Sequence, residues 1–184
     1  SAAKLYDGYY NRFFLSGVFH KTYPDEVLEG LGPHMPARWD EDFDVIGAPI
    51  DWCGINYYTR KLIAPDKGPW PSHHEVPGPL PRTAMEWEIY PEGLEFFLKR
   101  THAEYSKGLP IYVTENGMAA PDTVIDGAVP DPHRIDYLNA HLAAVQSALA
   151  DGVPVEGYFI WSLLDNYEWA LGYEKRFGLV HVDF

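Results

Sequence analysis

The fold is decided by one short stretch, Leu109-Pro110-Ile111-Tyr112-Val113-Thr114-Glu115-Asn116-Gly117. Its apolar run is typical of a short buried strand, and Asn116 and Gly117 open the turn beyond it. The strand therefore carries the carboxylate of Glu115 at its end. Barrels built from parallel strands and helices form their active sites at the carboxyl ends of the strands, so Glu115 is predicted to be catalytic. A turn glutamate that faces water is the alternative, and other motifs must decide between the two.

Helices and strands alternate on both sides of this stretch. Apolar residues at helical spacing predict helices over 91–106 and 132–150. Residues that favour β-structure predict strands over 50–58 and 155–161, with a final short strand over 178–182. Strands separated by helices of this length indicate parallel βαβ units. The predicted fold class is therefore α/β, with parallel strands alternating with helices.

The N-terminal part is expected to hold short helices and one long loop. Helices are predicted over 2–14, from Pro24 onward and over 40–46. A short strand extension is possible over 61–64. The stretch 65–81 is predicted to be a loop because its density of proline and glycine disfavours a regular element.

Composition and charge limit the kind of protein. A chain of 184 residues with 46% hydrophobic and 15% aromatic residues is large enough for one domain with a core. Its net charge of -13 repels phosphate groups, so we expect no nucleic-acid partner. No apolar run approaches about 18 residues and no leader is visible, so we expect no membrane partner. The single cysteine, Cys53, is typical of a reducing compartment, which favours a cytoplasmic protein unless a leader has been removed.

Histidines do not form a recognisable metal site. His73 and His74 are adjacent in the predicted loop, and His133 and His141 share one predicted helix. No third ligand is spaced to complete either set, and no glycine-rich phosphate loop is present. We therefore predict no metal and no cofactor.

Polar and aromatic groups gather at three predicted strand ends. Asn56 and Tyr58 follow the first strand, Glu115 ends the second, and a segment from Trp161 to Trp169 follows the third. Aromatic faces beside carboxylates and amides are the composition of a carbohydrate pocket. For any single tryptophan, ordinary packing is an equally good explanation.

Four motifs follow one another along the chain. They are Ile111-Tyr112-Val113-Thr114-Glu115-Asn116-Gly117, Gly54-Ile55-Asn56-Tyr57-Tyr58, Trp87-Glu88-Ile89-Tyr90-Pro91-Glu92-Gly93-Leu94, and Trp161-Ser162-Leu163-Leu164-Asp165-Asn166-Tyr167-Glu168-Trp169 continuing through Arg176-Phe177-Gly178-Leu179-Val180. Together they resemble glycoside hydrolase family 1, the β-glucosidase family. Their order and spacing are similar to that family along essentially all of the chain. The resemblance implies the C-terminal part of a (β/α)8 TIM barrel. Residues 1–184 would form a single structural unit that covers strands six to eight and lacks strands one to five and the last helix.

The resemblance also implies a retaining β-glycosidase that works by double displacement. Glu115 matches the nucleophile of the family, and Tyr58 matches the tyrosine whose hydroxyl touches that nucleophile. Asn56 matches a neighbouring polar group. A hydroxyl that donates to a carboxylate favours the ionised form that a nucleophile needs.

Five further residues match sugar contacts of the family. Trp161 matches the platform under the glycone ring, while Glu168 and Trp169 match residues that bind its outer hydroxyls. Phe177 would close the same pocket, and Trp87 matches a wall of the aglycone site. Because a carboxylate at position 168 would repel phosphate, a neutral glycone such as glucose, galactose or fucose is expected.

The same resemblance exposes a missing group. Retaining hydrolysis needs two carboxyl groups about 5–5.5 Å apart. The family carries its acid/base in an Asn-Glu-Pro motif, which this sequence lacks. We therefore expect a complementary N-terminal barrel portion, or self-association, to accompany the chain. The alternative is a catalytically inactive sugar-binding or scaffold fragment that self-associates through open barrel edges.

Overall fold

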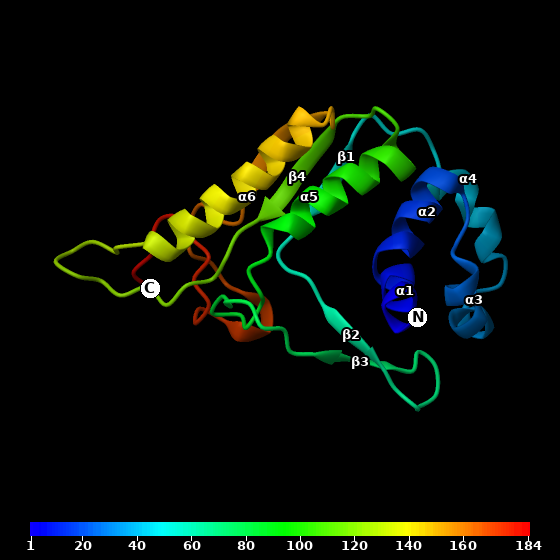
Figure 1. Cartoon of the computed structure of the whole chain (residues 1–184), viewed down its shortest axis with the longest axis horizontal. Coiled ribbons are helices and arrows are strands. Elements are labelled where there is room, and N and C mark those ends of the chain that lie inside the picture. Colours follow the sequence, from blue (N-terminus) through cyan, green and yellow to red (C-terminus); the bar gives the residue numbers. More distant parts are fainter. The chain divides into compact units, whose positions relative to one another are not determined.

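The computed structural model of the protein describes all of residues 1–184, and its contacts divide them into two compact units (Figure 1). Unit 1 comprises residues 1–51 and 61–78, and unit 2 comprises residues 52–60 and 79–184. That residues 1–184 form a single structural unit stays a prediction.

Unit 2 is built on a three-stranded parallel sheet. Its strands are β1 (Cys53–Asn56), β4 (Ile111–Asn116) and β5 (Val155–Ile160), in the order β1-β4-β5. Two helices connect the strands, α5 (Pro91–Arg100) before β4 and α6 (Pro132–Ala150) between β4 and β5. The two helices pack against each other beside the sheet (Figure 1). This is the parallel βαβ arrangement that the sequence predicts.

The two faces of β4 differ in burial. Ile111 and Val113 are fully buried, as are Leu94 and Leu98 of α5. Tyr112 and Thr114 alternate with the buried pair and lie on the opposite face of the strand. On that face, together with Trp52 and Phe159, they line a hollow of about 350 Å³. The sheet therefore has one covered face and one open face.

Local chemistry explains where α6 begins. The side chain of Asp131 accepts a hydrogen bond from the backbone nitrogen of Arg134, and Pro132 occupies the first turn. Both are the usual features of a helix N-terminus. The predicted helix over 132–150 is confirmed residue for residue.

The predicted strand over 178–182 is wrong. Only an isolated bridge joins Val180 to Leu164 in this region. The backbone nitrogens of Gly178 and Val182 instead donate to the side-chain oxygens of Asp165. Because the carboxylate of Asp165 occupies these donors, they are not available for a strand ladder.

Unit 1 contains helices and one hairpin. A continuous helical segment comprises α1 (Ala2–Asp7), a π-helical part (Gly8–Arg12) and α2 (Phe13–His20). The shorter helices are α3 (Asp25–Leu31), two 3-10 turns (Gly32–His34 and Trp39–Asp42) and α4 (Phe43–Ile46). None of the helices in the chain is both long and apolar enough to cross a membrane.

The loop predicted over 65–81 is wrong in part. Strand β3 (His73–Val76) pairs antiparallel with β2 (Leu62–Pro65). The prolines do not prevent this pairing, because Pro65 ends β2 and Pro77 follows β3.

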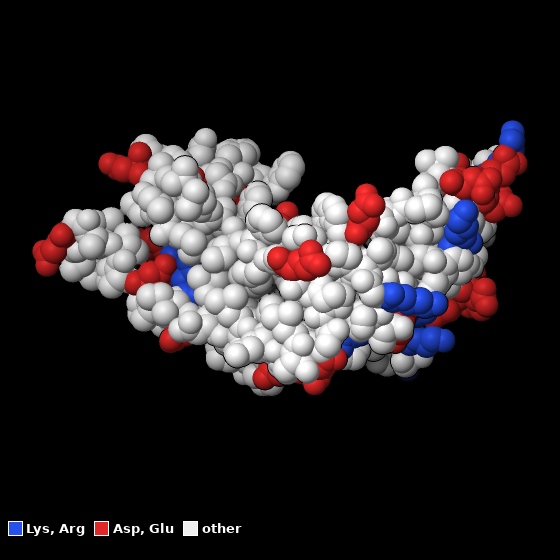
Figure 2. Space-filling view, turned by 90° about the horizontal axis from the view of Figure 1, so that it is seen from above, with Lys and Arg blue, Asp and Glu red and all other residues white.

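Acidic side chains are dispersed over the face of the molecule seen from above. Figure 2 shows Asp and Glu scattered across the face in view, in keeping with the net charge of -13.

Candidate active site

Glu115 lies at the carboxyl end of the central strand β4 and is partly buried. Tyr58 donates a hydrogen bond from its hydroxyl to Oε2 of Glu115 at 2.7 Å. The backbone nitrogen of Tyr57 donates to the carbonyl of Glu115 at 2.9 Å. The β1–β4 register shifts after Ile55, which brings Asn56 opposite Glu115. The carboxylate, the tyrosine and the amide that the sequence predicts are thus brought to one strand end.

Tyr58 is held in its protonated form. Burial raises its pKa most strongly, and the hydrogen bond to Glu115 and the charges of Glu115 and Glu168 raise it further. A phenol with a raised pKa donates a hydrogen bond throughout the neutral range. The carboxylate of Glu115 therefore has a permanent hydrogen-bond donor.

Two further aromatic rings pack against the ring of Tyr58. The ring centroid of Tyr58 lies 5.4 Å from that of Trp87 and 6.2 Å from that of Phe177. Trp87 and Phe177 are 6.2 Å apart. Phe177 is buried and packs against both the tyrosine and the tryptophan.

The segment after β5 places the remaining predicted residues. Trp161 is partly buried, and its backbone nitrogen donates to the carbonyl of Asn116 at 2.9 Å. Glu168 is partly buried and near enough to Tyr58 to affect its pKa. Trp169 is 81% exposed, so its indole is open to a ligand and makes little contribution to the core. Asn56 is also exposed and accepts a hydrogen bond from Thr114 Oγ1 at 2.6 Å.

The two residues after Glu115 have roles that the sequence does not reveal. Asn116 is predicted to open a turn, yet it is fully buried as the last residue of β4. Gly117 lies against the backbone of Trp161, because a Cβ at position 117 would be 1.8 Å from the Trp161 carbonyl oxygen. Glycine is therefore required at this point for the close approach of two backbones.

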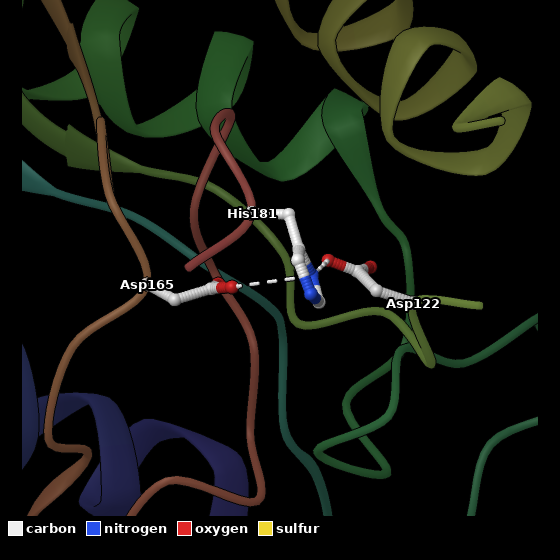
Figure 3. Close-up of side chains that lie close together, drawn as sticks. All are labelled: Asp122, Asp165 and His181. Carbon is white, nitrogen blue, oxygen red and sulfur yellow. Dashed lines mark ion pairs between the residues drawn. The ribbon is translucent and has the colours of Figure 1, made fainter. Parts of the chain in front are cut away.

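An ion-pair cluster lies between the segments that follow β4 and β5. Figure 3 shows the imidazole of His181 between the carboxylates of Asp122 and Asp165, with Nδ1 3.9 Å and 3.8 Å from their oxygens. Possible ligand atoms of these three residues lie within 4.8 Å of one another. However, Arg134 pairs with Asp122 at 3.0 Å, and Arg176 pairs with Asp165 at 2.6 Å. Since each carboxylate already has a cationic partner, the cluster is a structural network that joins the two segments.

Comparison with known proteins identifies the family. All of residues 1–184 match the family model described as glycosyl hydrolase family 1. The chain belongs to glycosyl hydrolase family 1. The resemblance of the four sequence motifs is confirmed.

Relatives within glycosyl hydrolase family 1 include β-glucosidases. The chain is 46% identical to a 1,4-beta-D-glucan glucohydrolase of Thermotoga neapolitana, over 93% of this chain and 40% of the relative. It is 41% identical to a β-glucosidase of Agrobacterium sp., over 96% of this chain and 39% of the relative. The solved β-glucosidase of Thermotoga maritima in complex with castanospermine superimposes with a TM-score of 0.93 at 43% identity. That superposition covers 99% of this chain and 41% of the solved chain.

The chain spans about 40% of the length of these family 1 relatives. The predicted fold class is confirmed: unit 2 is part of an α/β barrel, with Glu115 at the end of one of its parallel strands.

Proposed function

We propose that this chain supplies the nucleophile and part of the glycone pocket of a β-glycosidase that retains anomeric configuration. The observation that carries the proposal is the hydrogen bond from Tyr58 to Glu115 at the carboxyl end of β4. That pair lies among aromatic side chains suited to a sugar ring.

The proposed reaction has two displacements. The carboxylate of Glu115 attacks the anomeric carbon, and the bond to the aglycone oxygen breaks as an acid group protonates that oxygen. Water then attacks the anomeric carbon of the glycosyl ester, gives its proton to the same group, now a base, and releases Glu115 as a carboxylate. Tyr58 keeps Glu115 oriented between the two steps, because its hydroxyl stays protonated.

The acid group is proposed to come from outside this chain. Glu86 and Glu88, which flank Trp87, are the alternatives considered within the chain. Glu88 accepts hydrogen bonds from Arg60 at 2.7 Å and from the backbone of Leu80 at 2.9 Å, and these lower its pKa. A carboxyl with a lowered pKa is ionised and cannot protonate a leaving group at neutral pH. The side chain of Glu86 is 80% exposed to solvent.

The glycone is proposed to be a neutral sugar. The exposed indole of Trp169 and the carboxylate of Glu168 can bind outer hydroxyls, and Trp161 can lie under the ring. The carboxylate of Glu168 would repel a phosphate group on the sugar.

A complementary barrel portion is the proposed partner. The open sheet face exposes Trp52 and Phe159, which are 51% and 58% accessible. The solved family 1 chain extends well beyond the 41% that this chain matches. Further barrel strands would cover these side chains and bring the second carboxyl group.

The test is covalent labelling of Glu115 by an activated aryl fluoroglucoside, followed by intact mass. The leaving group of this probe needs no protonation, so labelling reports on the nucleophile without the acid group. We expect labelling when the chain is mixed with the N-terminal portion of a family 1 relative, and none for Glu115→Gln. Labelling of the Glu115→Gln variant at an unchanged rate would show that the nucleophile is wrongly assigned.

A sugar-binding or scaffold protein is the second candidate, and the open face with Trp52 and Phe159 favours it. Binding of glucose without any labelling would support the sugar-binding form. Concentration-dependent dimers without sugar affinity would support the scaffold.

A further inference from the structure

The side-chain amide of Asn116 joins three elements of unit 2. Its Nδ2 donates to the carbonyl of Tyr57 at 2.7 Å and to the hydroxyl of Tyr137 at 3.0 Å. Its Oδ1 accepts a hydrogen bond from the hydroxyl of Tyr158. Tyr57 directly follows β1, Tyr137 belongs to α6 and Tyr158 belongs to β5. All the hydrogen-bonding groups of this fully buried amide are therefore used.

The orientation of the amide follows from its partners. A backbone carbonyl can only accept, so the amide nitrogen must face Tyr57. Burial raises the pKa of Tyr137 and of Tyr158, so both remain protonated. With Nδ2 turned to Tyr57 and Tyr137, the amide presents Oδ1 to Tyr158, whose hydroxyl donates to it. A carboxylate at position 116 could accept the hydrogen bond from the Tyr158 hydroxyl. It has no N–H group to donate to the carbonyl of Tyr57, so the two oxygens would repel each other.

These hydrogen bonds involve the neighbours in sequence of Glu115 and Tyr58. Asn116 follows Glu115 in the chain, and Tyr57 precedes Tyr58. The Tyr57 nitrogen donates to the carbonyl of Glu115, and the Asn116 amide donates to the carbonyl of Tyr57. The Tyr137 hydroxyl also donates to the carbonyl of Tyr58 at 3.4 Å. Two hydrogen bonds thus join the backbone segments that carry the phenol and the carboxylate directly, and the Tyr137 hydroxyl bridges the Asn116 amide to the Tyr58 carbonyl.

Packing alone does not require a polar group here. A buried amide is costly unless fully hydrogen-bonded, and apolar packing of comparable stability would require replacement of the amide and of its hydrogen-bonding partners together. The convergence of one amide and two buried phenols on the residue next to Glu115 instead sets the relative position of β1, β4 and β5.

We propose that Asn116 is a positioning residue that holds the carboxylate of Glu115 against the hydroxyl of Tyr58. This inference rests on the proposed function for its catalytic meaning. The hydrogen bond that Asn116 maintains can be measured without catalysis.

The experiment follows the hydroxyl proton of Tyr58 by NMR in the full chain with isotope-labelled tyrosine. Tyr58→Phe identifies the signal. We expect slow exchange of this proton with solvent in the unchanged chain and fast exchange in Asn116→Asp and in Tyr158→Phe. Val145→Ala, at a buried position of α6, is the matched control for a general loss of packing and should retain slow exchange.

Two outcomes overturn the inference: slow exchange of the Tyr58 proton in a folded Asn116→Asp chain, or equal loss of protection in Val145→Ala. If Asn116→Asp does not fold, Tyr158→Phe alone decides, because it removes one hydroxyl and adds no charge.

A second readout links the position to chemistry. With the complementary portion present, Asn116→Asp should slow labelling of Glu115 by the activated fluoroglucoside about 10–100-fold, as expected for a misplaced reacting group. Val145→Ala should slow it less than about twofold. Absence of labelling in the unchanged chain would contradict the proposed function and leave the proton-exchange result to decide on Asn116.

Discussion

The hydroxyl of Tyr58 is the polar side-chain group that touches the carboxylate of Glu115, at 2.7 Å. Hydrogen bonds to charged groups contribute about 1.5–3 kcal/mol. We therefore expect Tyr58→Phe to lower kcat of the completed enzyme by about 10–100-fold, with a smaller change in KM. Steady-state kinetics with an aryl β-glucoside measure this. Tyr10→Phe, at an exposed tyrosine of unit 1, is the control and should be neutral.

Gly117 is the second residue whose chemistry can be tested directly. A methyl group there would collide with the Trp161 carbonyl oxygen, which belongs to the backbone and cannot move aside like a side chain. We expect Gly117→Ala to lower the free energy of unfolding by about 1–3 kcal/mol and to weaken sugar binding. Urea unfolding and tryptophan fluorescence titrated with glucose check the two effects. Gly32→Ala meets no atom within 4 Å and should cost little.

At the scale of elements, an ion pair joins α3 to the preceding helical segment. Arg12 donates to Oε1 of Glu26 at 2.5 Å and to Oδ2 of Asp7 at 2.8 Å. The hydrogen bond from Arg12 is the largest cause that lowers the pKa of Glu26, from 4.5 to about 2. Because the folded-state pKa is depressed, this stabilisation is fully present above pH about 4.5 and is lost as the pH falls through about 2.

We expect Glu26→Gln to lower the free energy of unfolding by about 1 kcal/mol at pH 7, a value reduced for solvent screening of a partly exposed pair. The difference from the unchanged chain should shrink steadily between pH about 4.5 and about 2. Urea unfolding across this range measures it. A difference that is independent of pH would show that packing, and not the charge of Glu26, is responsible.

Helices and strands could be predicted correctly where residues close together in the sequence determine them. Asp131 and Pro132 mark the start of α6, and its full extent follows from the sequence. Residues 73–76 were predicted to be a loop because the surrounding stretch is rich in proline and glycine. They form strand β3 because they pair with β2, and the local composition does not reveal this pairing. The strand over 178–182 was predicted wrongly because the side chain of Asp165, distant in sequence, takes its backbone donors.

At the scale of the whole molecule, the open face of the three-stranded sheet is the feature with most consequence. Phe159 is 58% exposed on this face, and Phe96 of α5 is 57% exposed elsewhere in unit 2. We expect the isolated chain to self-associate at micromolar concentration through the open face. Phe159→Asp should weaken this association strongly, and Phe96→Asp should weaken it little.

Sedimentation velocity over a concentration series measures the association. An equal effect of the two substitutions would mean that the sheet face is not the contact. Addition of a complementary barrel portion should compete with self-association if both cover the same face.

The sequence by itself determined the family and the α/β class, because short motifs and local periodicity carry this information. It also predicted Glu115, Tyr58 and the sugar-contact residues as the site, which stays a prediction. Tertiary structure alone decided the position of Asn116. The sequence alone does not distinguish an asparagine in a turn from a buried asparagine. Only the folded chain brings Tyr57, Tyr137 and Tyr158 around the amide of Asn116. Hydrogen bonds between residues far apart in sequence have no local signature, which is the physical reason for the difference.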